Sequence, residues 1–194
     1  MARPRTFDCD EVIVKASYLF TRQGFAATTM DQLAATTGAS LHSLYADYGG
    51  KKGLFEATLK TYLTEDIIRG VMAPLLAEGA GFEDLQRFFD DLAQVAKSGE
   101  RDASCLICLT MMRMDDDDPE LRGVVQAYLQ IVDQAFRNVL GNAKQAGAAR
   151  ADLDIAKSAA FLTGILLGLN LYLRSPAGAE RIEDYLSAAL ASLH

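Results

Sequence analysis

The chain has 194 residues, of which 50% are hydrophobic and 23% are charged. This composition supports a sizeable buried core and excludes wholesale disorder. With 26 acidic and 19 basic residues, the formal net charge of −7 excludes bulk electrostatic attraction to nucleic acid or to an anionic membrane surface. A local basic face remains compatible with this balance.

Three cysteines and two histidines are too few for a disulfide framework or a standard structural zinc site, so we expect no metal and no cofactor. The N-terminus carries basic residues without an apolar stretch behind them and is not expected to be a signal peptide. The longest apolar run, from Phe161 to Leu173, is short for a bilayer span of roughly 20 residues. We therefore expect a cytoplasmic protein with no membrane partner.

A helical period of 3.6 residues recurs along the whole chain, and neither strand alternation nor a hairpin signal is present. Glycines and capping residues divide the N-terminal part into a helix that ends at Gly24, a short helix from Thr29 to Gly38, a third from Ser40 to Gly49, and a fourth that continues to Leu63.

Longer helices are predicted beyond residue 75, at about 81–98, 102–114, 118–146, 152–174 and 178–193. Asp118 is the expected N-cap of one of them, with Pro119 at its first helical position. The predicted fold is all-α. A three-helix head, residues 1–53, precedes a larger helical body, residues 54–194.

The segment from Thr28 to Tyr48 has the layout of a helix-turn-helix, whose second helix enters the DNA major groove. Leu41, His42 and Ser43 lie in the first turn of that helix, where side chains approach base edges, and its N-terminal amides favour phosphate. Tyr45 lies one turn further along. By geometry alone, a plain helical hairpin in a small core explains the segment equally well.

The same region resembles the N-terminal domain of the TetR family of transcriptional regulators over about a quarter of the chain. The matching residues fall in order and spacing: Ala16, Leu19, Phe20, Gly24, Thr28, Thr29, Leu33, Ala34, Gly38, Ser40, Leu44, Tyr45, Lys51, Leu54 and Phe55. The resemblance implies that Thr29 caps the second helix and contacts phosphate, that Ser40, Leu41, His42 and Ser43 read bases, and that Tyr45 and Lys51 grip the DNA backbone.

Three positions depart from the family pattern. His42 stands where a glycine or proline is frequent, Asp47 where a histidine or tyrosine is frequent, and Tyr48 where phenylalanine is usual. A carboxylate near phosphate is repelled, so no DNA contact is expected of Asp47. His42 is either a donor to base edges or a solvated surface histidine.

For the body, the resemblance implies a pocket for an unknown small-molecule inducer and dimerisation through the last two long helices. Bulky or adaptable side chains are the pocket candidates, although each is equally an ordinary core residue. They are Phe88, Phe89, Cys105, Cys108, Met111, Met112, Tyr128, Phe136 and Phe161.

Small residues recur every four positions at Ala160, Gly164 and Gly168, which allows two helices to approach closely. Glycine destabilises a helix interior by about 1 kcal/mol, so the two glycines need a packing reason. The contact is either the interface of a homodimer or a helix crossing inside one subunit. A symmetric dimer would present two recognition helices to a palindromic double-stranded DNA operator.

Cys105 and Cys108 lie three residues apart near the start of a predicted helix, on one face, where a helix N-terminus lowers a thiol pKa. Some TetR-type electrophile sensors have a cysteine in a G-C-L segment at about this place, where this chain has Ser104. The two thiols are either buried small hydrophobes or the redox centre of a sensor that uses Cys105.

Two other classes compete. An all-α enzyme would use the run Asp115–Asp118 for Mg²⁺, but consecutive carboxylates on a helix diverge, and no second acidic cluster or nucleophile–base pair accompanies them. We therefore expect no catalytic residue. A helical interaction domain explains the body but not the head.

The charges divide unevenly, because residues 1–60 carry seven basic and six acidic side chains whereas residues 61–194 carry twelve and twenty. The expected DNA-facing charges are Arg3, Arg5, Lys51 and Lys52. The sequence predicts a homodimeric TetR-like regulator, a repressor rather than an activator, whose operator affinity comes from two small heads acting together.

Overall fold

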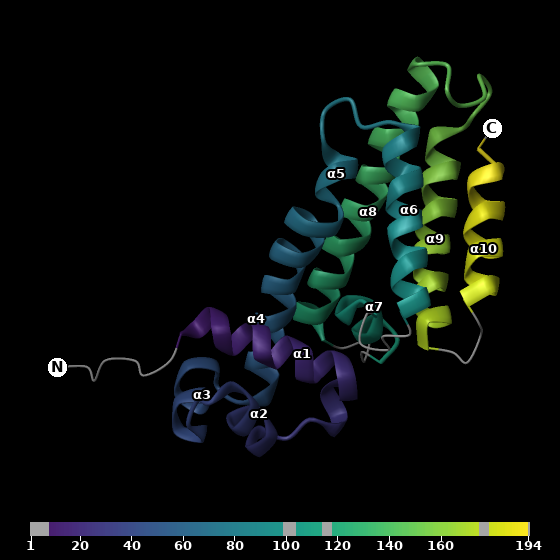
Figure 1. The fold of residues 1–194 in the computed structure, drawn as a ribbon. Coiled ribbons are helices and arrows are strands. Elements are labelled where there is room, and N and C mark those ends of the chain that lie inside the picture. The colour runs from purple at the N-terminus through teal and green to yellow at the C-terminus, as the bar shows by residue number, and fades with distance from the viewer. Residues whose placement is uncertain (1–7, 99–103, 114–117, 175–178, 194) are drawn as a thin grey trace. The chain divides into compact units, whose positions relative to one another are not determined.

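The computed structural model describes residues 8–98, 104–113, 118–174 and 179–193 (Figure 1). All regular secondary structure in these ranges is helical, which confirms the all-α prediction. Contacts between residues divide the chain into two compact units, Met1–Glu65 with Cys105–Val125, and Asp66–Ser104 with Gln126–His194. The candidate residues Arg3, Arg5 and Asp115–Asp117 lie outside the described ranges.

The first unit contains the predicted head. Helix α1 (Cys9–Ala27) leaves regular helical geometry at Gly24, where φ is 79° and ψ is 166°, so the predicted helix end is confirmed. Helices α2 (Met30–Thr37), α3 (Leu41–Tyr48) and α4 (Lys51–Tyr62) follow. The ends of α2 and α3 and the start of α4 agree with the predicted ones because each of these boundaries is set by a local cap or a glycine, whereas α4 continues directly into the next helix.

The core of the head is aromatic and fully buried at its centre. The Phe55 ring centroid lies 4.8 Å from those of both Phe20 and Phe25. Leu33 from α2 and Leu44 from α3 have no exposed surface, and each supplies the central buried side chain of its short helix. Because an eight-residue helix is marginal alone in water, this packing is what holds α2 and α3 in place.

The same unit includes α7 (Leu106–Met111) and the start of α8 (Pro119–Gln145). Helix α7 packs against α1 and α4. A guanidinium nitrogen of Arg113 lies 2.8 Å from where a Cβ atom on Gly24 would stand. Gly24 therefore has two roles: it adopts the backbone conformation that ends the regular helix, and its lack of a side chain leaves room for Arg113.

The second unit contains most of the predicted body. It comprises much of the π-helix η1 (Leu63–Val71), α5 (Ala73–Leu76), α6 (Phe82–Ser98), most of α8, α9 (Ile155–Arg174) and α10 (Ala179–Ala191). The side-chain amide of Asn138 donates to the carbonyl oxygens of Leu75 and Ala77 at 2.8 and 3.0 Å, which joins the end of α5 to α8.

Two features of the described helices differ from the prediction. Neither η1 nor α5 was expected, and the amide of Met72 reaches the carbonyl of Ile67 five residues back, at 2.8 Å, as in a π-turn. The helix predicted at 102–114 is confined to Leu106–Met111, because Cys105 already has extended backbone angles. The others agree with prediction to within three residues.

Candidate functional site

The N-terminus of α2 is closed by a reciprocal pair of hydrogen bonds. The Thr29 hydroxyl accepts the amide of Gln32 at 3.2 Å, and the Gln32 side chain accepts the amide of Thr29 at 2.9 Å. Such a capping box satisfies two helix-end amides that otherwise lack partners. The predicted cap at Thr29 is therefore present, whereas a phosphate contact by this exposed residue stays a prediction.

The turn between α2 and α3 depends on glycine. Gly38 ends α2 in the left-handed region, with φ of 79°. Ser40 then caps α3 by accepting the amide of Ser43 at 3.1 Å, and the hydroxyl groups of Ser40 and Ser43 lie 2.9 Å apart in a second hydrogen bond. The first turn of α3 thus leaves Leu41 and His42 exposed, and engages both serine hydroxyls internally.

Tyr45 lies one turn after Leu41 and keeps 54% of its surface exposed. Its ring packs against the backbone at Gly50, where an added Cβ atom would stand 3.2 Å from the ring. Gly50 also has φ of 118°, a conformation that residues with a side chain rarely adopt. The glycine therefore both turns the chain into α4 and leaves room for the tyrosine.

Lys51 binds the end of α1. Its ammonium group donates to the carbonyl oxygens of Phe25 and Thr28 at 3.0 and 2.9 Å, and lies 4.4 Å from the Phe25 ring centroid. These contacts tie the first turn of α4 to the residues immediately before Thr29. The structure thus places Lys51 beside the DNA-binding candidates, with two of its donors already on protein carbonyls.

Lys52 lies beside carboxylates. Its ammonium group is 2.9 Å from Asp118 and 3.7 Å from Glu56. The lysine holds the pKa of the Asp118 carboxyl below its ordinary value, helped by the amide of Leu121. The expectation that Lys52 is a DNA-facing charge gains no support from this pairing, whereas the predicted N-cap at Asp118 is confirmed.

A second ion pair joins the same two elements, because Lys60 on α4 is 2.8 Å from Glu120 in the first turn of α8. Sequence reasoning missed both cross-links. The sequence contained only a weak signal for these ion pairs. Two lysines lie eight positions apart on one helix, and the acidic residues on either side of Pro119 were considered for the helix start rather than as partners of those lysines.

Cys105 and Cys108 hold thiols close together within the first unit. The pKa of Cys105 is lowered to about 7, first by a hydrogen bond from the Cys108 thiol and then by the amides of Cys108 and Ile107 and the Tyr62 hydroxyl, while burial acts in the opposite direction. The pair is thus chemically distinct from an ordinary buried cysteine.

The pocket candidates do not form one group. Phe88, Phe89 and Phe136 are buried in mutual ring contact in the second unit, with centroids 5.1 to 6.1 Å apart, and Tyr128 is 2% exposed. Such contacts are those of a packed core. Phe161 is 48% exposed on α9 in the second unit. The other candidates lie in the first unit: Met112, which is 50% exposed, the half-buried Met111, Cys105 and Cys108.

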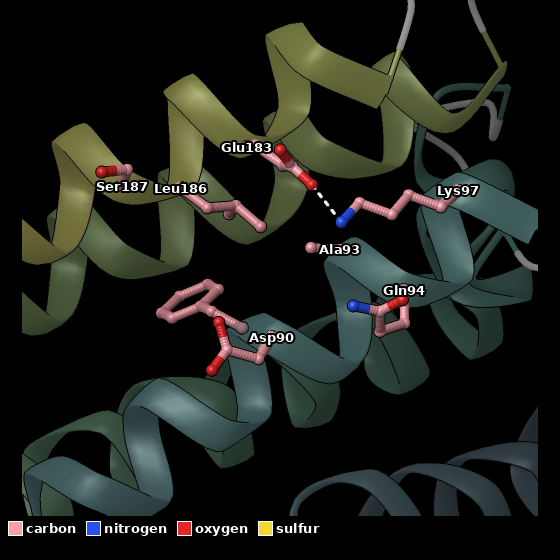
Figure 2. A pocket seen from close by; sticks show the side chains of 8 residues that line it. Asp90, Ala93, Gln94, Lys97, Glu183, Leu186 and Ser187 are labelled. Atoms are coloured by element: carbon pink, nitrogen blue, oxygen red, sulfur yellow. Dashed lines mark ion pairs between the residues drawn. The ribbon is translucent and has the colours of Figure 1, made fainter.

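A hollow of about 290 Å³ lies between α6 and α10 (Figure 2). Of the predicted pocket residues, only Phe89 lines it. Figure 2 shows Lys97 of α6 pointing toward Glu183 of α10, with which it forms an ion pair. Both side chains are nearly half exposed, so this hollow is an open surface groove rather than an enclosed cavity.

The small residues of α9 have different surroundings. A Cβ atom on Gly164 would meet nothing within 4 Å, and Ala160 is exposed. A Cβ atom on Gly168 would instead lie 2.5 Å from the hydroxyl oxygen of Tyr185 on α10, which donates to the carbonyl of Ile165 at 3.3 Å. Gly168 therefore serves an internal crossing of α9 and α10, and Ala160 and Gly164 face outward.

No cluster of three or more potential metal ligands occurs among the residues that the structure describes. Helix α9 is long and apolar enough to cross a membrane by length and composition alone, over Ile155–Leu173, although the apolar run considered by itself was short. Only 33% of this segment is buried within the chain. Its exposed apolar surface therefore calls for an explanation.

Two family profiles match the chain. One, described as "Bacterial regulatory proteins, tetR family", matches residues 12–58, and the other, described as "Tetracyclin repressor-like, C-terminal domain", matches residues 81–189. The second alone spans more than half of the chain, and together they cover both the helix-turn-helix and the body.

Known proteins resemble the chain over almost its full length. It is 29% identical to the uncharacterized HTH-type transcriptional regulator YezE of Bacillus subtilis (strain 168) over 194 residues, 100% of both chains. It is 26% identical to the HTH-type transcriptional repressor ComR of Escherichia coli (strain K12) over 189 residues, 97% of this chain and 90% of ComR.

Solved structures share the fold. A cysteine variant of the TetR family transcriptional regulator CifR, complexed with a 26-base-pair double-strand operator DNA, matches with a TM-score of 0.83 and 25% identity over 98% of this chain and 99% of that one. The reduced form of E. coli NemR matches with a TM-score of 0.80 and 15% identity, over 95% and 97%.

Proposed function

Because the chain belongs to the TetR family of bacterial regulatory proteins, we propose that it is a homodimeric repressor that binds a palindromic DNA operator and is released by a small-molecule inducer. It is a DNA-binding transcriptional regulator and not an enzyme. The observation that carries the proposal is the first turn of α3, which is capped by Ser40 and presents Leu41 and His42 to solvent.

The head supplies DNA contacts of two kinds. The N-terminal amides of α3 and the exposed Tyr45 and Thr29 suit phosphate, while side chains in the first turn of α3 suit base edges. Lys51 contributes by holding the turn before Thr29, and a direct phosphate contact would use its remaining donor. The operator complex of CifR supports this assignment by analogy of fold and family.

The outer face of α9 supports the homodimer. Phe161 and Leu171 are 48% and 55% exposed, and the exposed small residues Ala160 and Gly164 lie beside them on the outward side of the helix. Covering this apolar face removes it from water, which is favourable, so a regulator in water is stabilised when a partner covers it. In a family of bacterial regulatory proteins, a second copy of the chain is a more suitable cover than a bilayer, which supports a location in the cytoplasm.

Residues 1–53 are assigned to DNA binding and residues 54–194 to regulation. Residues 105–125 of the regulatory part belong to the same compact unit as the head, and their helix α7 packs on α1 and α4. This packing supports a way for a change in the regulatory part to reach the DNA-binding residues. An inducer that prefers one arrangement of the body would then weaken operator binding. The effect is limited to the inducer's difference in affinity between the two states.

DNA from the region flanking the gene provides the direct test, by gel shift or fluorescence anisotropy with the purified protein. Specific binding is expected, and His42→Ala should weaken it by an amount that differs between operator variants, whereas Tyr45→Phe should weaken it about equally for all of them. Absence of any sequence-specific binding, both to that DNA and in a selection from random duplexes, would contradict the proposal.

The dimer has its own test. Phe161→Asp should convert the protein to a monomer in sedimentation equilibrium, since an unpaired carboxylate in an apolar interface destabilises association by about 2–5 kcal/mol. Val95→Asp on α6 is the matched control, because Val95 is also an exposed apolar residue, at 36%, but lies outside the α9 face. Equal effects of the two variants would remove the α9 assignment.

A second candidate function is a thiol-based sensor in which oxidation of Cys105 releases the operator. The pKa of Cys105 is lowered to about 7, which favours the reactive thiolate, and the Cys108 thiol lies next to it. A quinone could accept the two electrons and two protons released when the two sulfurs join.

Treatment with a quinone or hypochlorite tests this candidate. Operator release is expected in the wild type and in Cys9→Ser, a matched control with a half-buried cysteine on α1, but not in Cys105→Ser. An undiminished response in Cys105→Ser would eliminate the sensor and leave the inducer-controlled repressor intact.

A further inference from the structure

The first turn of α3 contains one large apolar side chain, Leu41, that keeps 38% of its surface exposed. The geometry points to Leu41 as a residue that sets operator sequence by packing against the 5-methyl group of a thymine in the major groove. This inference rests on the proposed function, because it requires that α3 lies in that groove.

Elimination within the first turn supports the assignment. The Ser40 hydroxyl caps the helix, and the Ser43 hydroxyl is engaged with it at 2.9 Å. Leu44 has no exposed surface. Leu41 and His42 are the two exposed side chains of this turn, whereas the exposed hydroxyl of Ser40 before it is occupied by the cap; of the two, only His42 is polar.

The exposed surface of α3 has an apolar ridge. Leu41 is 38% exposed, and Tyr45, four residues later on the same face, is 54% exposed with its ring held against Gly50. A leucine at the first position of a helix makes no capping bond and has no role in satisfying helix-end amides. Its exposed surface is available to an apolar partner in the complex.

The major groove offers one such partner. Among the groups that base pairs present there, hydrogen-bond donors and acceptors form most of the pattern, and the thymine 5-methyl group is the apolar one. A leucine can neither donate nor accept, so it discriminates between bases only through that methyl group.

The lack of basic side chains in the helix-turn-helix makes the contact of Leu41 more important for sequence readout. Helices α2 and α3 contain no lysine or arginine, and each contains an aspartate, Asp31 and Asp47. The common arginine contact with guanine is thus absent from both helices. Among the exposed side chains in the first turn of α3, sequence readout then rests on Leu41 and His42.

The experiment removes the methyl group alone. The full-length protein first selects its duplex from a random pool, and each thymine of the selected half-site is then replaced by deoxyuridine, which deletes the 5-methyl group and keeps the base pair. For the wild type, at least one replacement should weaken binding about fourfold, the effect of one buried carbon.

Leu41→Ala, combined with the deoxyuridine replacement, completes a double-mutant cycle between the side chain and the methyl group. In this variant the same deoxyuridine replacement should have no effect, because the apolar partner is already gone. Leu41→Gln is a second variant that keeps a helix-compatible side chain of similar length. His42→Ala is the matched control from the same turn, and it should retain the fourfold methyl effect.

The outcomes separate the two proposals. If no duplex is selected, the proposed function fails and this inference fails with it. If a duplex is selected but no thymine depends on its methyl group, or if the methyl effect persists in both Leu41 variants, the assignment of Leu41 is overturned while the repressor stands.

Discussion

Lys51→Ala should loosen the turn before α2 without changing the number of counterions released on DNA binding. The ammonium group donates to two carbonyl oxygens, at 2.9 and 3.0 Å, and lies 4.4 Å from the Phe25 ring centroid. Hydrogen bonds from charged groups contribute about 1.5–3 kcal/mol each, and an exposed cation–π contact about 0.5–1 kcal/mol. Because Lys51 is only partly buried and the contributions overlap, we expect a loss of about 2–3 kcal/mol.

Hydrogen exchange of the Leu33 amide measures this loss locally, since that amide bonds to the Thr29 carbonyl at 3.0 Å. Its opening free energy should fall by the expected amount, and operator affinity should fall as Thr29 moves. The slope of log affinity against log salt should stay constant. Lys60→Ala is the control, because it removes the same charge from the same helix but only an exposed surface ion pair, which contributes little to stability.

A different pattern would refute the reasoning. If the salt slope of Lys51→Ala falls by about 0.9 while the Leu33 amide keeps its protection, the lysine neutralises a phosphate and the carbonyl contacts do not matter. If affinity, slope and protection are all unchanged, Lys51 serves neither the turn nor the DNA.

Three further predictions concern stability. Gly168→Ala should destabilise the second unit by about 1–3 kcal/mol relative to Gly141→Ala in urea unfolding, because its methyl group would lie 2.5 Å from a tyrosine hydroxyl whereas that of the control meets nothing. Thr29→Ala should lower the opening free energy of α2 amides by about 1 kcal/mol, and Thr29→Ser should restore it. The pKa of the Asp118 carboxyl is lowered in the folded chain, so its ion pair stabilises the protein above about pH 4 and this stabilisation is lost as pH falls through the lowered pKa. In Asp118→Asn, the free energy of unfolding should therefore fall less steeply as the pH is lowered below about 4.

The boundaries of the head could be predicted because they depend on bonds between near neighbours in the chain. Thr29 and Gln32 are three residues apart, as are Ser40 and Ser43, and Gly38 ends α2 through its own backbone angles. No distant partner has to be known for such caps to be recognised. The same holds for Asp118, which caps α8 through the amide of Leu121.

The regulatory body could be predicted as helices but not as a pocket. Phe88, Phe89 and Phe136 have the composition expected of a ligand site, but their rings pack on one another. Apolar side chains that line a cavity and those that fill a core obey the same periodicity. The groove between α6 and α10 was missed because its charged lining, such as Lys97 and Glu183, resembles an ordinary solvated face.

The sequence by itself determined that the chain is helical, where its short helices start and stop, and that its head resembles a known DNA-binding arrangement, because each of these depends on local hydrogen bonding and residue order. Only the tertiary structure decided what individual side chains do. Lys51 binds carbonyls 23 and 26 residues away, and Gly168 makes room for Tyr185 at the α9–α10 crossing. Such roles depend on which surfaces meet when the helices pack, and the free energy of that packing is shared among residues distant in the chain.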